Sequence, residues 1–167
     1  MKISDLSKDN ISGAIKLGMR IFPWADDTSE PLTGCLKASL DMKGHAKELK
    51  KMNIKDIKYY LAIEDGIVVG LTGLFSYITD ADGIYWVGWT CVDDLMQGKG
   101  FGSKLIDHII KVSRDEGKRM LKVYTNQEMF PAALHIYEKK GFKSVSMDSV
   151  DMGNGKSYNR LILEMKL

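Results

Sequence analysis

The spacing of apolar residues predicts where helices and strands lie along the chain. Residues 1–6 favour a short strand, and apolar side chains then recur at helical spacing over residues 11–17. Ser7 precedes this stripe and has the side chain of an N-cap residue, so the first helix is expected to begin there. Residues 24–53 predict a loop followed by a second, broken helix. A longer apolar stripe over residues 105–112 predicts the third helix.

Runs of aromatic and β-branched residues predict the strands of a sheet. After the first strand, these runs cover residues 59–63, 67–78, 84–92, 121–125, 142–150 and 157–167. Polar turns separate the first three runs and favour hairpins, and the glycine-rich residues 153–155 are expected at the turn of the last pair. Gly117 closes the third helix, and a fourth helix is expected from Pro131 to Gly141.

The predicted elements follow one another in the order β-α-α-β-β-β-α-β-α-β-β. Because helices interrupt a series of strands and hairpins, the expected class is a mixed α/β fold in which helices cover a mixed sheet. The chain has 167 residues, which fits a single domain over residues 1–167. A chain of this length can bury a core without disulfides or a structural metal.

The charge balance excludes several classes of binding protein. Lys and Arg number 24 and Asp and Glu 22, which gives a formal net charge of +2. Dedicated binders of nucleic acids or membrane surfaces carry a one-sided basic field, so neither partner is expected. Two cysteines are too few for a disulfide framework, and the three histidines stand apart, so no metal site is expected. No signal-peptide core follows Met1, and the expected location is cytoplasmic.

Residues 97–103, Gln-Gly-Lys-Gly-Phe-Gly-Ser, join a predicted strand to the third helix and have the composition of an anion site. The first N–H groups of a helix lack internal partners, its dipole is positive there, and glycines let an anion approach the backbone. The run is not a Walker A loop, because Gly98-Lys99 is followed by Gly100. It is not the dinucleotide fingerprint, because Ser103 replaces the third glycine. Taken alone, the run fits a structural turn without a ligand equally well.

Two motifs, in sequence order, resemble those of the GCN5-related N-acetyltransferase (GNAT) superfamily. Gln97-x-x-Gly100-x-Gly102 is similar to the family signature Q/R-x-x-G-x-G/A and follows a predicted strand. Residues 133–142, Ala-Leu-His-Ile-Tyr-Glu-Lys-Lys-Gly-Phe, resemble the second family motif, A-x-x-x-Y-E-K-x-G-F. Two motifs in the correct order are far more specific than either one alone. The resemblance covers residues 84–142, and the order of the other predicted elements also matches the family.

The resemblance implies a mostly antiparallel, mixed seven-stranded sheet with about four helices, and acetyl-coenzyme A (acetyl-CoA) as the acyl donor. It also implies that the backbone of the glycine-rich turn holds the pyrophosphate and that the pantetheine arm pairs with the end of the fourth strand. By position, the cofactor-binding residues would be Cys91, Val92, Gln97, Gly98, Lys99, Gly100, Phe101, Gly102, Ser103, Asn126, Ala133 and Tyr137. Relatives often form dimers, so a homodimer is a further expectation.

Tyr137 matches the residue that usually serves as the general acid in this family. The implied reaction is direct attack of an amine on the thioester in a ternary complex. A phenol held close to the leaving thiolate can supply its proton. A strand-end N–H such as that of Val92 is a candidate donor for the tetrahedral oxyanion. A tyrosine on a helix face can also serve core packing alone, and then Tyr137 would have no chemical role.

The general base departs from the family pattern. Some relatives carry a glutamate on the fourth strand where this sequence has Trp86, and many carry an asparagine where it has Phe130. Asp82 and His135 lie nearby in sequence, but a turn aspartate and a surface histidine are the simpler interpretations. A water relay is therefore the expected route for the amine proton. Cys91 has no His or Asp at an activating spacing, which disfavours covalent catalysis.

The loops that border the acceptor in this family are acidic here. They contain Asp26, Asp27, Glu30, Asp148 and Asp151. An acidic rim attracts cations, so the hypothesis is a positively charged amine such as a polyamine, an aminoglycoside or a lysine-containing peptide. Ordinary solvated loops would carry the same residues. The aromatic residues considered for substrate contact are Phe22, Trp24, Tyr85, Trp86 and Trp89.

Two other functions remain compatible with the sequence. One is a non-catalytic acyl-CoA-binding sensor or regulatory module, which the missing strand carboxylate would suit. The other is a nucleotide-phosphate binder without acyl chemistry, which would bind ATP or NAD as well as coenzyme A (CoA).

Overall fold

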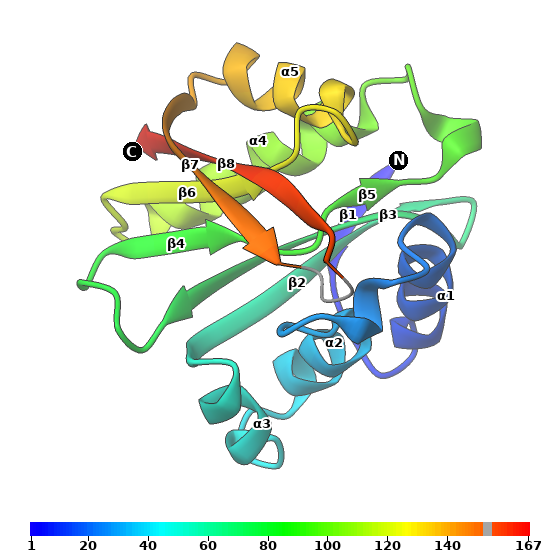
Figure 1. The fold of residues 1–167 in the computed structure, drawn as a ribbon. Helices are drawn as coiled ribbons and strands as arrows, with labels where there is room; N and C mark the ends of the chain where they lie inside the picture. Colours follow the sequence, from blue (N-terminus) through cyan, green and yellow to red (C-terminus); the bar gives the residue numbers. More distant parts are fainter. Residues whose placement is uncertain (152–154) are drawn as a thin grey trace.

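One mixed sheet organises the chain, and helices cover both of its faces (Figure 1). The computed structural model describes residues 1–151 and 155–167. The strands are β1 (Lys2–Asp5), β2 (Ile54–Glu64), β3 (Ile67–Tyr77), β4 (Ile84–Val87), β5 (Cys91–Val92), β6 (Met120–Thr125), β7 (Lys143–Asp151) and β8 (Ser157–Lys166). The α-helices are α1 (Ile11–Ile21), α2 (Leu32–Leu40), α3 (Ala46–Lys51), α4 (Phe101–Asp115) and α5 (Pro131–Lys139). Two short 3-10 helices, η1 (Ala25–Asp27) and η2 (Asp94–Met96), precede α2 and α4.

The sheet confirms the predicted mixed, mainly antiparallel class. Its strand order in the described part of the chain is β1-β2-β3-β4-β6-β8-β7, with β5 beside β3. The pairing of β4 with β6 is parallel, and the other pairings are antiparallel. The described residues form eight strands and five α-helices rather than the predicted seven and four. The broken second helix becomes α2 and α3, and the predicted strand over residues 84–92 divides into β4 and β5.

Each face of the sheet has its own apolar core. On one face, α1 and α2 bury residues such as Leu17 and Leu36 against Leu61. On the other, Ile109 of α4 and Leu134 of α5 pack over the strands, and Figure 1 shows these two helices across the sheet from α1 and α2. Two-sided coverage explains why β2 and β3 are apolar along most of their length. The same arrangement lets elements from both faces meet at the end of the central strands.

The start of α1 differs from the prediction. Asn10, not Ser7, occupies the N-cap position, and the helix begins at Ile11. The Asn10 side chain reaches back to accept a hydrogen bond from the Ser7 N–H at 2.8 Å and to donate one to the Asp5 carbonyl at 3.2 Å. It therefore stabilises the preceding turn instead of capping the helix, and the Ser7 assignment was wrong.

The division between β4 and β5 comes from one extra residue. Leu74 of β3 pairs with Val87 and Leu71 pairs with Cys91, so residues 88–90 hold one residue more than the facing part of β3. An insertion of this kind is a β-bulge, which breaks the ladder locally and redirects the strand. We call residues 88–90 the strand break. The turn of the last hairpin was predicted at residues 153–155, of which Gly153 and Asn154 lie outside the described residues.

Candidate active site

The edge of β5 that faces away from β3 has no strand partner in the described part of the chain. Val92 lies opposite Gly70 of β3, whereas β6 pairs with β4 only along residues 120–122. The Asp93 N–H donates to the Val69 carbonyl at 2.8 Å. Backbone groups alternate between the two edges of an antiparallel strand. The Val92 N–H therefore points away from β3, toward an open edge with which an extended ligand can pair.

The turn between η2 and α4 has the geometry of an anion site. Gly98 and Gly100 have φ angles of 75° and 79°, and a β-carbon at either position would meet no atom within 4 Å. Gly100 is also the N-cap of α4, and no side chain caps this 15-residue helix. Its first N–H groups and the positive end of its dipole are therefore available beside an open turn. This backbone suits a diphosphate, because side chains at the two glycines would stand where the anion approaches.

The side chains of this turn offer fewer groups to an anion than its backbone does. Phe101 is buried in the core, so only its N–H can face a ligand. Gln97 and Lys99 are exposed, and Ser103 is half-buried. The Lys99 ammonium lies 3.4 Å from the Met96 sulfur. The turn thus offers backbone donors and one mobile positive charge, as expected for an anion rather than for a base-specific ligand.

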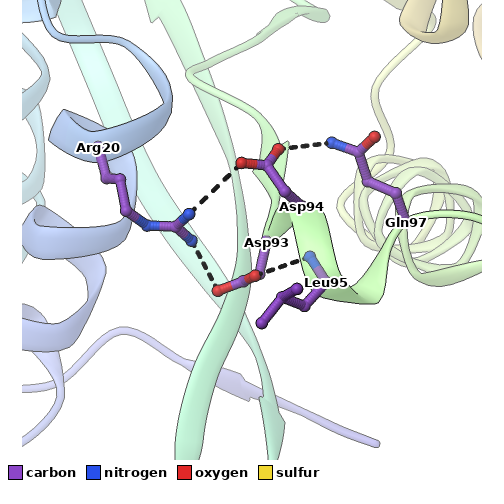
Figure 2. A network of polar contacts seen from close by, with 5 residues as sticks. All are labelled: Arg20, Asp93, Asp94, Leu95 and Gln97. Carbon is purple, nitrogen blue, oxygen red and sulfur yellow. Dashed lines mark hydrogen bonds and ion pairs between the residues drawn. The ribbon is translucent and has the colours of Figure 1, made fainter.

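An ion-pair network connects the end of α1 to the segment before this turn (Figure 2). Arg20 lies in the last turn of α1, and its guanidinium contacts Asp93 at 2.7 Å and Asp94 at 3.4 Å. The other oxygen of Asp94 accepts from the Gln97 amide at 3.0 Å, and that of Asp93 from the Leu95 N–H at 3.0 Å. Two carboxylates therefore stand next to the anion site, and Arg20 compensates part of their charge.

Tyr137 is a buried phenol whose hydroxyl reaches the strand break. Its ring packs on Phe142 with centroids 5.4 Å apart, and its hydroxyl lies near the Thr90 side chain. The Thr90 hydroxyl also contacts the Thr72 hydroxyl at 2.8 Å and lies 3.0 Å from the Gly88 carbonyl. Burial raises the pKa of Tyr137 to about 12, and the nearby Thr90 side chain opposes this rise. Tyr137 is therefore protonated at neutral pH and placed beside the open edge of β5.

Three other predicted cofactor residues have different surroundings. Cys91 is buried, and burial raises the pKa of its thiol to about 12, so it is not an activated nucleophile. Ala133 is half-buried in the first turn of α5. The buried Asn126 amide donates to the Asn159 carbonyl at 2.7 Å and accepts from the Met129 N–H at 2.8 Å. Through these two hydrogen bonds, Asn126 holds the loop before α5 in place.

Neither residue considered as a general base lies at the strand break. Asp82 is in the turn before β4, with its side chain 94% exposed, and pairs with Lys55 at 3.1 Å. The hydrogen bond from Lys55 lowers the pKa of Asp82. His135 is exposed on α5, whereas Tyr137 is on the buried side of the same helix. The structure thus leaves the strand without a carboxylate in the family position.

The aromatic residues considered for substrate contact do not share one face. Tyr85 is fully buried on the side of α4, where its hydroxyl contacts Asp56 at 2.9 Å and Glu116 at 2.6 Å. Its hydroxyl is therefore already engaged with two carboxylates on that face of the sheet. Because successive strand residues point to opposite faces, Trp86 lies on the other side, in the core beneath α1 and α2. Trp24 is exposed.

Phe130 stands where many relatives have an asparagine, and it forms part of an aromatic group. Its ring lies edge-on to Phe22 at 5.7 Å, and Phe22 in turn contacts Trp89 of the strand break at 5.3 Å. The end of α1, the strand break and the loop before α5 therefore meet through apolar rings. This contact replaces the polar group expected at the position of Phe130.

Glu30 is the acidic loop residue that turns inward. Its carboxylate accepts hydrogen bonds from the Tyr77 hydroxyl at one oxygen and from the Tyr124 hydroxyl, at 2.9 Å, at the other. Its carbonyl accepts from the Trp89 indole N–H at 2.9 Å. The pKa of both tyrosines is raised, first by burial and then by the charge of Glu30. Glu30 thus belongs to the interior of the site rather than to its rim.

No local pattern in the sequence indicates Arg20, Tyr77 or Tyr124 as site residues. Arg20 and Asp93 are 73 residues apart, and Tyr124 and Glu30 are 94 apart, so no local spacing connects them. Thr90 carried a weak signal, since it is a polar residue immediately before the predicted strand end.

Residues 1–151 and 155–167 contain neither a metal-binding cluster nor a membrane-spanning helix. No group of three or more His, Cys, Asp or Glu side chains is placed to hold a metal ion. No helix in these ranges is long and apolar enough to cross a membrane.

Comparison with known proteins agrees with this geometry. A family model described as an acetyltransferase (GNAT) domain matches residues 55–144, more than half of the chain. No curated protein matches the sequence.

Solved structures resemble the whole chain in fold. The IAA acetyltransferase from Bacillus cereus aligns with a TM-score of 0.69 at 20% identity over 99% of both chains. The ribosomal-protein-alanine N-acetyltransferase from Brucella melitensis aligns with a TM-score of 0.71 at 15% identity over 100% of both. The structure of yncA from Salmonella typhimurium with its cofactor acetyl-CoA aligns with a TM-score of 0.74 at 17% identity, over 100% of this chain and 94% of that one. At these identities the likeness shows the fold alone.

Proposed function

Because the chain belongs to the GNAT acetyltransferase family, we propose that it transfers the acetyl group of acetyl-CoA to an amine. One observation carries this proposal. The Tyr137 hydroxyl meets Thr90 at the strand break, directly beside the open edge of β5 and on the same segment as the glycine-rich turn. An acyl donor that spans the turn and the open edge brings its thioester to this phenol.

The donor is proposed to bind through the backbone. The N–H groups at the start of α4, between Gly100 and Ser103, take the diphosphate, and Lys99 adds a positive charge nearby. The pantetheine arm pairs with the open edge at Cys91 and Val92. The side chains of Gln97, Asn126 and Ala133 are proposed to border the donor rather than to hold its charge. These roles follow from the positions of the residues and from the resemblance to the family motifs.

The proposed reaction is a direct acyl transfer. The neutral amine nitrogen attacks the thioester carbonyl carbon, and the Val92 N–H stabilises the resulting oxyanion. The carbon–sulfur bond then breaks and the sulfur takes the proton of Tyr137. The amide nitrogen loses its extra proton to solvent, and Tyr137 regains a proton from solvent, which restores the acid. The burial that raises the pKa of Tyr137 also disfavours a thiolate beside it, so the leaving sulfur gains from taking a proton there.

The main alternative is a module that binds acyl-CoA without turnover. Thiol release from acetyl-CoA distinguishes the two, measured with alkyl diamines, an aminoglycoside and a lysine-containing peptide as acceptors. We expect release above the protein-free rate with at least one acceptor class. Binding of acetyl-CoA with no release from any of them would favour the sensor or regulatory module.

Arg20 provides a further test of the proposed donor site. Replacing Arg20 with glutamine leaves Asp93 and Asp94 uncompensated beside the diphosphate site. Because these pairs are partly exposed, we expect acetyl-CoA to bind about two- to fivefold more weakly, with the difference shrinking at high salt. Calorimetry at two salt concentrations measures both effects.

Two variants control this measurement. Arg20→Lys keeps the charge and should bind acetyl-CoA much as the unaltered protein does. Lys16→Gln removes an exposed charge from α1 outside the network, and it should have a smaller effect. Equal weakening in Lys16→Gln and Arg20→Gln would show that only the net charge of the helix matters.

A further inference from the structure

Glu30 lies in an aromatic group of side chains close to the strand break. We define the Glu30 cluster as Glu30, Tyr77, Asp80, Trp86 and Tyr124. Its rings are in contact, with centroids 5.6 Å apart for Tyr77 and Trp86 and 5.1 Å apart for Trp86 and Tyr124. The Trp89 indole N–H, hydrogen bonded to the Glu30 carbonyl, connects the cluster to the strand break. The cluster therefore lies on the α1–α2 side of the sheet, opposite α5, which brings Tyr137 to the break from the other face.

The two carboxylates of the cluster accept hydrogen bonds only from neutral groups in the described part of the chain. Glu30 accepts from the hydroxyls of Tyr77 and Tyr124. Asp80 accepts from the Trp86 indole at 2.8 Å and from the Tyr77 N–H at 3.4 Å. An ionised carboxylate has about four lone-pair sites, so Glu30 can still accept from an incoming N–H donor.

Two cations that lie over rings of the cluster are already paired with other carboxylates. Arg160 lies 4.5 Å over a tyrosine ring of the cluster, but Asp148 holds its guanidinium at 2.6 and 2.9 Å. Lys122 lies 5.5 Å over the tryptophan ring, but its ammonium pairs with Glu164 at 2.8 Å. Neither Glu30 nor Asp80 forms an ion pair within the described residues, and Lys55 and Lys118 line one pocket with Asp80 but not with Glu30.

An aromatic group with uncompensated negative charge favours one chemical class of ligand. Ring faces attract cations, and a partly buried carboxylate gains most from a partner that brings both a positive charge and N–H donors. A primary alkylammonium group has both properties and an apolar stem that can lie on the rings. A carboxylate-bearing acceptor would bring a second negative charge next to Glu30. An uncharged acceptor would leave the charge of Glu30 without a counterion.

We infer that Glu30 determines acceptor specificity, pairing with the ammonium group of a cationic alkylamine against the rings of Tyr77, Trp86 and Tyr124. This inference rests on the proposed acetyl transfer and names the class of its acceptor. Tyr77 and Tyr124 hold the two carboxylate oxygens in place, so they position Glu30 rather than bind the ligand through charge. Glu30 thereby draws the amine to the strand break, where the thioester is proposed to lie.

The test uses binding without turnover. The full chain is saturated with CoA and titrated at neutral pH with hexylammonium chloride, 1-hexanol and sodium hexanoate, which share one apolar stem. Tryptophan fluorescence or calorimetry reports binding. We expect hexylammonium to bind at least about tenfold more tightly than hexanol, and hexanoate to bind most weakly. Hexanol binding as tightly as hexylammonium would overturn the inference, and this comparison requires no variant.

Glu30→Gln tests the residue itself, because the amide keeps the size of the side chain and can still accept a tyrosine hydrogen bond. We expect it to lose the preference for hexylammonium over hexanol. Asp65→Asn is the matched control, since it removes one exposed charge from the β2–β3 turn at a positive φ of 49° that asparagine tolerates. Unchanged hexylammonium binding in Glu30→Gln, or an equal loss in Asp65→Asn, would overturn the inference. If acetyl-CoA still binds and turns over, that result leaves the proposed function intact.

Discussion

Replacing Tyr137 with phenylalanine is expected to lower kcat about 100-fold or more while leaving the Kd for acetyl-CoA nearly unchanged. The substitution removes only the hydroxyl and keeps the ring that packs on Phe142. Without that proton the sulfur must leave as a thiolate in a buried site, which raises the barrier to carbon–sulfur cleavage. Steady-state thiol release and calorimetry measure the two quantities separately.

Tyr60→Phe is the matched control for this substitution. Tyr60 is also a buried phenol whose pKa burial raises to about 12, but it lies on β2 and packs on His108 beneath α4, with β3 between it and the strand break. It should keep nearly full activity. An equal fall in kcat for both variants, or a Tyr137→Phe enzyme of normal rate, would contradict the acid role.

The proposed role of Tyr137 as general acid also predicts how the reaction rate depends on pH. Tyr137 has a raised pKa of about 12, so it stays protonated at neutral and moderately alkaline pH. The rate should rise with pH as the amine loses its proton, and Tyr137 should cause no fall until the pH approaches its own pKa.

Replacing Gly100 with valine is expected to weaken acetyl-CoA binding about 10- to 100-fold. Gly100 has a φ of 79° at the N-cap of α4, and its missing side chain leaves the approach to the first helical N–H groups open. A branched side chain disfavours this backbone conformation and occupies the path of the diphosphate. Loss of one or two charge-assisted hydrogen bonds accounts for a change of this size.

Gly117 at the other end of α4 offers a control for strain. It has a φ of 69°, and a β-carbon there would also meet no atom within 4 Å. Gly117→Val should therefore lower thermal stability by a similar amount and leave acetyl-CoA binding intact. If Gly117→Val weakened binding as much as Gly100→Val, the effect would come from the stability of α4 and not from a diphosphate at its N-terminus.

Local signals explain which parts of this fold the sequence could predict. The third helix and its closing glycine follow from spacing within one segment, and α4 with Gly117 confirms them. The strand break does not follow from composition, because residues 84–92 are mostly aromatic and β-branched. It depends on the register against β3, which pairs residues far from it in sequence. Gly88 was the one local hint, since glycine within a strand often marks a bulge.

The candidate site also has some residues that local sequence identifies and others that only the tertiary structure identifies. The glycine-rich turn and Tyr137 lie in motifs and were identified at the correct positions along the fold, although their roles stay predictions. Glu30 was recognised only as one acid among several loop acids, because its partners Tyr77 and Tyr124 come from distant strands. What distinguishes it from its neighbours is burial against those phenols, and burial depends on the tertiary structure.

Calorimetric titration of the full chain with acetyl-CoA, and in parallel with CoA, ATP and NAD, tests the central claim most directly. A donor site built from the α4 N-terminus and the open edge of β5 predicts selective binding of acetyl-CoA and CoA in the micromolar range, with ATP and NAD far weaker. Absence of CoA binding, or equal binding of ATP or NAD, would contradict the assignment of this site to acetyl-CoA and with it the proposed acetyl transfer.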